Sequence, residues 1–314
     1  MDKKYNIVVT GGAGYIGSTL VPELVQLGHE VTVIDNFMYK QNSLAAVCRY
    51  KNFHIVKGDI RVKETIQPYL KKADIVIPLA ALVGAPLCNQ DPITATTVNY
   101  DAIIMMLNLM SCEQKIYMPT TNSAYGSGDK NNFCTEESPL NPISHYAQEK
   151  VKVEKELMKH PNAVSLRLAT VFGISPRMRT DLLVNDFTYR AVYDKYVLLF
   201  EGHFKRNYVH VRDVARAFLH MITNHDRVKG QIYNVGLSEA NISKKELCEK
   251  IQQFIPDFVF VEATVGKDPD QRNYIVSNEK IEKTGFKPHT TIEEGIRELI
   301  KGFTMIKNSV YGNV

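Results

Sequence analysis

Short apolar runs alternate with stretches of helical spacing through the first half of the chain. The runs predict strands, and the stretches between them, where apolar residues recur every three or four positions, predict helices. Strands are expected at Tyr5–Thr10, Glu30–Ile34, Phe53–Lys57, Asp74–Leu79, Lys115–Met118 and Ala163–Leu168, and helices at Tyr15–Leu27, Asp91–Cys112 and Ser144–His160. This alternation is typical of an α/β fold with a doubly wound parallel sheet, whose strands are apolar on both faces.

The second half is less regular, and its pattern predicts a smaller lobe. Helices are expected at Asp181–Asp194, Val211–Asn224, Ser243–Phe254 and Ile292–Lys307, with short strands between them. We therefore expect a Rossmann domain over residues 1–170, with a return segment at about 205–235. Residues 171–204 and 236–314 would form a mixed α/β substrate-binding lobe, packed closely enough to bind a ligand between the lobes.

Composition narrows the class of protein. The 314 residues are 44% hydrophobic and 23% charged, as in globular proteins, and the net charge of +4 predicts no nucleic-acid or membrane partner. The apolar runs are too short for a membrane span or a signal peptide, so a cytoplasmic location is expected. Five widely spaced cysteines, without a Cys-x-x-Cys pair, predict neither a disulfide framework nor a zinc site, and no metal is expected.

A glycine-rich turn, Gly11–Gly17, follows the first predicted strand and opens the first helix. Glycines at this spacing permit a tight turn, a close approach of a pyrophosphate and close helix–strand packing. Asp35 ends the second strand, where a carboxylate accepts ribose hydroxyls and disfavours a 2′-phosphate. The context favours NAD. Asp59, after the third strand, is placed to meet an adenine edge or to cap a helix.

Tyr146 and Lys150 are four residues apart on a predicted helix and therefore share a face. A phenol with a pKa of about 10 becomes a useful base only when a cation stabilises its phenolate. Thr121 follows a strand at the carboxyl edge of the sheet, where ligands bind in such folds. A hydroxyl there can hydrogen-bond a substrate oxygen while Tyr146 exchanges its proton.

Together these motifs resemble the extended short-chain dehydrogenase/reductases that act on nucleotide sugars, over essentially the whole chain. The matching positions include Gly11–Gly17, Asp35, Asp59-Ile60, Leu79-Ala80-Ala81, Asn99, Thr121 with Tyr125-Gly126, Tyr146 with Lys150, Arg167, Phe172-Gly173, Arg206–Val211, Tyr233–Gly236, Arg272 and Gly285–Pro288.

The resemblance implies hydride transfer from a sugar carbon, usually C4, to NAD. It implies a catalytic set of Thr121, Tyr146 and Lys150. Cofactor contacts are expected from Gly11, Gly14, Tyr15, Ile16, Gly17, Asp35, Asn36, Asp59, Ile60, Leu79, Ala80, Ala81, Asn99, Tyr146 and Lys150. Substrate contacts are expected from Thr121, Asn122, Ser123, Arg177, Arg179, Asn185, Arg206 and Arg272.

Some of these substrate assignments have alternatives. Arg272 would bind the diphosphate of the nucleotide sugar through its guanidinium, or else be a surface arginine. Arg177 and Arg179 would contact substrate or carboxylates of the second lobe. Cys88 would line the sugar pocket or be a buried, inert thiol.

The residues after Thr121 narrow the expected reaction. The family's 4,6-dehydratases carry Asp and Glu there as acid and base, whereas this chain has Asn122 and Ser123, so dehydration is disfavoured. Local strings are most similar to a branch that oxidises C4 of GDP-D-glycero-α-D-manno-heptose in bacterial capsule biosynthesis. That branch implies retained NADH and an external keto-acid such as 2-oxoglutarate to regenerate NAD.

Two alternatives stay open. A nucleotide-sugar 4-epimerase would use the same residues for transient C4 oxidation. A non-catalytic NAD-sensing protein is disfavoured because both Tyr146 and Lys150 are present. The resemblance also implies a homodimer, formed by pairing of the helices near Thr94–Met110 and Ser144–Met158.

Overall fold

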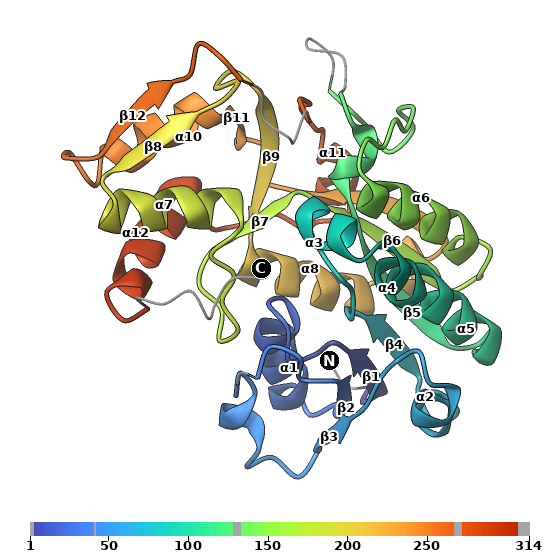
Figure 1. The fold of residues 1–314 in the computed structure, drawn as a ribbon. Coiled ribbons are helices and arrows are strands. Elements are labelled where there is room, and N and C mark those ends of the chain that lie inside the picture. Colours follow the sequence, from blue (N-terminus) through green and yellow to red (C-terminus); the bar gives the residue numbers. More distant parts are fainter. Residues whose placement is uncertain (1–2, 41, 128–132, 267–271, 307–314) are drawn as a thin grey trace.

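A seven-stranded parallel sheet forms the centre of the larger lobe (Figure 1). The computed structural model describes residues 3–40, 42–127, 133–266 and 272–306. The strand order is β10–β6–β5–β4–β1–β2–β3, with β1 (Asn6–Thr10), β2 (Glu30–Asp35), β3 (Phe53–Lys57), β4 (Ile75–Pro78), β5 (Lys115–Thr121), β6 (Ala163–Leu168) and β10 (Gln231–Val235). The chain winds outward from β1 to β3 and then returns to β4 on the other side of β1. This doubly wound arrangement confirms the predicted fold class.

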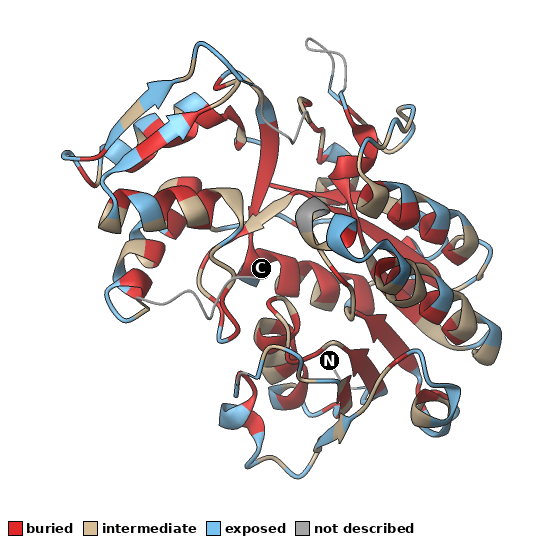
Figure 2. Ribbon diagram, in the orientation of Figure 1, coloured by how far each residue is buried: buried red, intermediate tan, exposed pale blue. Residues whose placement is uncertain are grey.

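Helices cover both faces of the sheet. On one face α1 (Gly17–Gln26) packs against α8 (Val211–Thr223); on the other lie α2 (Lys63–Leu70), α5 (Ala102–Leu109) and α6 (His145–Leu157). Within β1, Ile7 and Val9 enter the first core and Val8 the second. Burial on both faces explains why these strands are continuously apolar, and Figure 2 shows the sheet as buried throughout its centre.

The helix expected at Asp91–Cys112 is divided into three parts. After α3 (Ala85–Gln90), the Asp91 carboxylate caps α4 (Pro92–Thr96), a π-helical turn follows at Thr97–Asp101, and α5 then begins. The turn brings Asn99 into the interior, where its side chain accepts from the Leu82 N–H and donates to the Leu82 carbonyl, both at 2.9 Å. The interruption therefore fixes the loop that follows β4.

The smaller lobe contains two short sheets and three main helices. One sheet is formed by β7 (Thr170–Phe172), β9 (Lys205–His210) and β11 (Asn241–Ser243), the other by β8 (Tyr196–Leu199) and β12 (Val259–Glu262). Its helices are α7 (Leu183–Tyr193), α10 (Lys244–Gln252) and α12 (Ile292–Phe303), and the latter two begin with capping boxes. Two single-turn helices, α9 (His225–Val228) and α11 (Glu279–Glu282), and 3₁₀ turns at Ala45–Val47 and Asn122–Tyr125 complete the fold.

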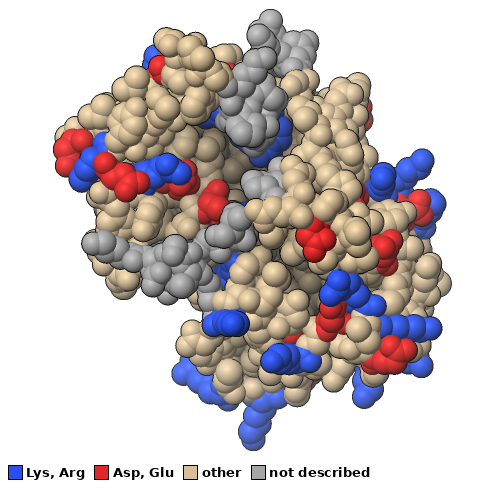
Figure 3. Space-filling model, in the orientation of Figure 1, with Lys and Arg blue, Asp and Glu red and all other residues tan. Residues whose placement is uncertain are grey.

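Charge is distributed without a dominant sign. Figure 3 shows Lys and Arg side chains interspersed with Asp and Glu over the face drawn there. Along the described ranges, no helix combines the length and the apolar character needed to cross a membrane.

Candidate active site

The glycine-rich turn brings backbone N–H groups to the carboxyl edge of the sheet. Gly11 has φ +66°, and a Cβ atom there would lie 2.5 Å from the backbone of Ala80, so the turn requires glycine. Gly17 packs equally closely on Gly12. The first turn of α1 has neither a side-chain cap nor an acidic residue. Its N–H groups and helix dipole therefore suit a phosphate, as NAD would supply.

A cavity of about 270 Å³ opens beside this turn. Nine of the residues predicted to bind cofactor line it: Gly11, Gly14, Asp35, Asn36, Asp59, Ile60, Leu79, Ala80 and Ala81. The other predicted cofactor residues are not among those that line the cavity: Tyr15, Ile16, Gly17, Asn99, Tyr146 and Lys150. The Tyr15 hydroxyl donates to the Gly173 carbonyl at 2.6 Å and so joins α1 to the second lobe.

Asp35, the last residue of β2, lines the cavity. Its Oδ2 accepts from the Ala13 N–H at 3.0 Å and its Oδ1 from the Phe37 N–H at 2.8 Å. Burial raises the pKa of this carboxyl, and the two backbone donors oppose that rise. Each carboxylate oxygen can accept a further hydrogen bond, so the group remains able to bind a diol.

Tyr146 and Lys150 lie on α6, which begins at the cap formed by Ser144. Lys150 is buried, and its Nζ lies 5.9 Å from the centroid of the Tyr146 ring. Burial raises the pKa of the Tyr146 phenol to about 12, while Arg179 and Arg272 oppose that rise. Burial lowers the pKa of the Lys150 ammonium to about 8. At neutral pH the pair is therefore a phenol beside an ammonium.

Thr121 is the last residue of β5. It pairs with Leu168 of β6, one position beyond the pairing of Thr120 with Arg167. The Thr121 hydroxyl donates to Ser123 Oγ at 3.0 Å and accepts from the Ser123 N–H. Ser123 in turn accepts a hydrogen bond from the Arg272 guanidinium. The structure thus brings Arg272, from a distant part of the chain, to Ser123 and Thr121. All three residues were predicted to contact substrate.

The other predicted substrate residues have more varied surroundings. Asn122 is fully buried, and neither its Oδ1 nor its Nδ2 has a partner among the described residues. Asn185 is also buried and accepts from the Gly173 N–H at 3.0 Å. Arg179 forms an ion pair with Asp181 at 2.5 Å, and Arg206 is buried in β9. Arg177 lines the cofactor cavity.

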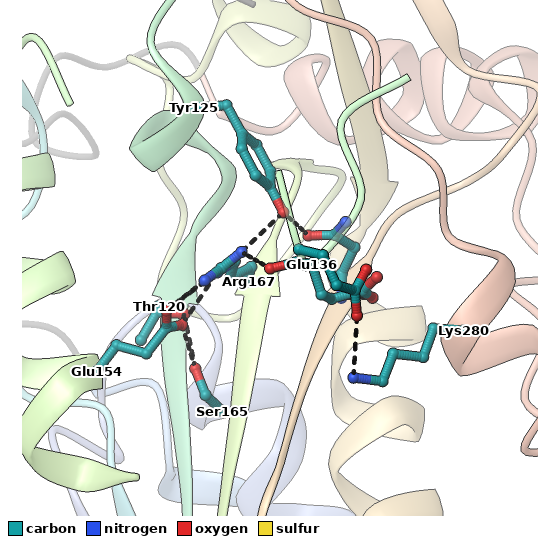
Figure 4. Close-up of polar contacts among 9 residues, drawn as sticks. Thr120, Tyr125, Glu136, Glu154, Ser165, Arg167 and Lys280 are labelled. Carbon is teal, nitrogen blue, oxygen red and sulfur yellow. Dashed lines mark hydrogen bonds and ion pairs between the residues drawn. The ribbon is translucent and has the colours of Figure 1, made fainter. Parts of the chain in front are cut away.

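A buried polar network holds the strand ends beneath Thr121 (Figure 4). Arg167, on β6, forms a 2.6 Å ion pair with Glu154 of α6, and its Nη1 donates to the Tyr125 hydroxyl at 3.0 Å. The Tyr125 hydroxyl donates to Asn234 on β10, and Glu154 also accepts from Thr120 on β5. The carboxyl ends of β5, β6 and β10 are therefore fixed to α6.

Several residues at the site were missed by the sequence analysis. The loop after β2 contributes Phe37, Met38, Tyr39 and Lys40 to the cavity, and Arg61 lines it opposite. Their spacing carries no signal, because a loop side chain's direction depends on packing that is distant in sequence. Glu149, which is buried and precedes Lys150 in the chain, lies between Tyr146 and Lys150, but the sequence analysis assigned it no role. Cys88 is buried in a cluster against which Tyr146 packs. Its burial agrees with the interpretation of this residue as a buried thiol.

Comparison with known proteins identifies the family. Residues 7–236 match the NAD dependent epimerase/dehydratase family, and the chain belongs to it. It is 26% identical to the low-salt glycan biosynthesis protein Agl12 of Haloferax volcanii, over 94% of this chain and 97% of that one. The cofactor is NAD, and the protein is an enzyme.

Two solved structures show the same fold. UDP-glucose 4-epimerase of Thermotoga maritima, solved with UDP-glucose, is 25% identical with a TM-score of 0.84, covering 96% of this chain and 99% of that one. UDP-glucose 4-epimerase of Thermus thermophilus, solved with NAD, is also 25% identical, with a TM-score of 0.81 and coverage of 95% and 98%. The finer resemblance to enzymes acting on GDP-heptose finds no counterpart among these named relatives.

Proposed function

We propose that the protein oxidises C4 of a nucleotide-linked sugar to the 4-keto sugar. The observation that carries the proposal is the buried Lys150 ammonium, 5.9 Å from the Tyr146 ring, in a chain of an NAD-dependent family. The absence of carboxylates at Asn122 and Ser123 favours oxidation without loss of water. Nucleotide sugars are the substrate class, as in the similar structure solved with UDP-glucose.

In this mechanism the chain's own residues transfer one proton. When NAD is bound, its nicotinamide ring accepts the hydride that leaves C4. Tyr146 acts in its phenolate form, which the Lys150 ammonium stabilises. The phenolate takes the proton of the C4 hydroxyl and becomes a phenol. Thr121 hydrogen-bonds the sugar oxygen and orients it. The C4–H and O–H bonds break, and the carbonyl bond forms between the same carbon and oxygen.

For the cofactor, we propose direct contacts from the nine predicted residues that line the cavity. For the sugar nucleotide, we propose Asn122, Ser123, Arg179, Arg206 and Arg272, with Arg272 leaving Ser123 to bind the diphosphate. A guanidinium binds phosphate oxygens in bidentate fashion, which suits that task. Asn185 would act indirectly, by holding Gly173 and the Arg179 backbone.

GDP-D-glycero-α-D-manno-heptose is the substrate we propose, in capsule or surface polysaccharide biosynthesis in the cytoplasm. The local sequence strings support it, and so does similarity to a glycan biosynthesis protein. Turnover would then need a keto-acid such as 2-oxoglutarate, which is reduced to its hydroxy acid as NADH returns to NAD. A homodimer also remains a proposal; light scattering decides whether the molar mass is one or two times 35.6 kDa.

A nucleotide-sugar 4-epimerase is the second candidate. It is favoured because 4-epimerases are among the similar solved structures, the two described above included. In that case the 4-keto sugar would rotate in the site and be reduced from its other face. Both reactions use the same Tyr146 and Lys150, so the outcome depends on how firmly the sugar ring is held.

Mass spectrometry of reaction mixtures distinguishes these activities. The enzyme is incubated with NAD and GDP-, UDP-, dTDP- or CDP-sugars, GDP-heptose included, with and without 2-oxoglutarate; Tyr146→Phe is the control. We expect a product lighter by two hydrogens that accumulates only with the keto-acid. An unchanged mass with a new C4 configuration by NMR would instead establish the epimerase. Loss of water would contradict both candidates.

A further inference from the structure

The cofactor cavity contains one buried cation that comes from the second lobe. Among its described lining residues, the cations are Lys40, Arg61 and Arg177. Lys40 is exposed, and Arg61 is an exposed partner of Asp59, with an Nη2–Oδ2 distance of 2.6 Å. Arg177 is only 2% exposed. A cation in such a position strongly favours a neighbouring anion.

Arg177 is held beside the N-terminus of α1. It follows β7 in the chain, and its backbone N–H donates to Ser18 Oγ at 3.2 Å. The neighbouring Ser175 hydroxyl lies 2.8 Å from Ser18 Oγ and donates to the Tyr15 carbonyl at 2.7 Å. These contacts dock the second-lobe segment onto the first turn of α1. The guanidinium is therefore placed where the helix end favours a diphosphate.

Arg177 and Tyr39 form a stacked pair at this cavity. The guanidinium carbon lies 3.8 Å from the centroid of the Tyr39 ring. The Tyr39 hydroxyl is buried and has no hydrogen-bond partner among the described residues. A buried hydroxyl without a partner destabilises the folded chain, and a ligand oxygen would remove that cost. The guanidinium donates through Nη1 to the Met178 carbonyl at 3.2 Å, and its planar set of five N–H donors can bond a further acceptor in the same plane.

We propose that Arg177 and Tyr39 bind the ADP half of NAD and so fasten the second lobe to the cofactor. Arg177 would neutralise the diphosphate, and the Tyr39 hydroxyl would bond an oxygen of the same half. This assigns Arg177 to the cofactor instead of the sugar substrate. Asp35 faces the same space as an acceptor, which matches a ribose diol and opposes a 2′-phosphate.

Calorimetric titration of the full chain, freed of nucleotide, tests the pair. NAD and ADP-ribose are titrated into wild type, Arg177→Met and Tyr39→Phe, with Arg179→Met as the control cation two residues away. We expect Arg177→Met to weaken both ligands by about 10- to 100-fold, the loss of one charged hydrogen-bonding group. Nicotinamide mononucleotide should bind all variants equally, and Arg179→Met should bind NAD within about twofold of wild type.

The Tyr39→Phe variant distinguishes an effect on ligand binding from an effect on the stability of the fold. It retains the stacking ring and removes a hydroxyl that has no hydrogen-bond partner among the described residues. We expect the melting temperature without nucleotide to be unchanged or higher, with ADP-ribose binding weakened about 3- to 10-fold. Wild-type NAD affinity in a folded Arg177→Met protein would overturn the proposal. So would a loss of nucleotide-sugar binding in that variant with NAD binding intact.

Discussion

At the scale of single residues, Lys150 places a charge where the fold disfavours it. Its side chain is buried in α6, and burial lowers the pKa of its ammonium to about 8. An unfolded lysine has a pKa of about 10.4. The ammonium therefore destabilises the folded chain at neutral pH, and the catalytic role that we propose for Lys150 would explain why it is present.

We expect Lys150→Met to lower kcat by about 100-fold or more while raising the free energy of unfolding at pH 7. The pKa difference, from 10.5 to about 8, corresponds to a gain on the order of 3 kcal/mol. Between pH 8 and 10 the unfolded wild type binds more protons than the folded one, so wild-type stability rises with pH there. The advantage of the variant should narrow across that window.

Urea unfolding of both proteins at pH 7 and pH 10 measures this effect. Lys152→Met, an exposed lysine two residues further along α6, is the matched control and should change neither activity nor pH dependence. A Lys150→Met variant that is less stable than wild type at pH 7 would show that the ammonium has a stabilising partner in the folded chain.

At the scale of elements, a buried ion pair connects α6 to the sheet and stabilises the packing of the helix on it. Glu154 and Arg167 are 6% and 4% exposed at their side chains, whereas Glu156 on α6 and Lys159, just beyond the end of that helix, are 33% and 66% exposed. Removing one partner of a buried pair leaves an uncompensated charge. An exposed pair contributes little because water screens it.

Glu154→Gln should therefore lower the free energy of unfolding by about 3–5 kcal/mol, and Glu156→Gln by less than about 1 kcal/mol. Denaturant melts of the two variants compare the same substitution on one helix. Because Glu154 also accepts from Thr120, beside Thr121, for which we propose a catalytic role, Glu154→Gln should lower kcat as well. Equal effects in the two variants would mean that the connection of α6 to the sheet depends on packing alone.

Some helices and strands were predicted well from the sequence, and others were missed. Strands β3 and β6 begin and end as expected, although β6 alone is buried along its whole length and β3 is the partly exposed edge strand. β5 extends to Thr121, since pairing with β6 continues through polar residues. Helices α2 and α3 were missed: α2 buries only Ile66 and Leu70 and contains Pro68, and α3 has proline at its start.

Motif residues within one element were predictable in the same way, but their long-range partners were not. The spacing of Tyr146 and Lys150 places both on one helical face without knowledge of the fold. The position of Arg177 in the cofactor cavity depends on how a second-lobe segment docks onto α1, through contacts 157 to 160 residues apart in sequence. No local pattern records such contacts, so Arg177 was placed with the substrate.

At the scale of the whole molecule, the cofactor site lies where the two lobes meet. Tyr15 lies two residues before α1 yet packs into the core of the second lobe, and its hydroxyl donates to the Gly173 carbonyl. Ser18 and Ser175 add a second joint nearby. A ligand bound against both sides stabilises them together, because it binds only the folded, docked arrangement.

NAD should consequently raise the melting temperature of the chain as one transition, adding about 2.7 kcal/mol at 100 times its Kd. In hydrogen exchange, we expect NAD to protect the turn at Gly11–Gly17, the loop after β2 and the second-lobe segment 173–179 alike. Helix α10, whose residues do not line the cavity, is the internal reference. Protection confined to the first two segments would show that the lobes respond to the cofactor separately. In that case Arg177→Met would leave the NAD-induced rise in melting temperature unchanged, whereas joint protection requires the variant to reduce it.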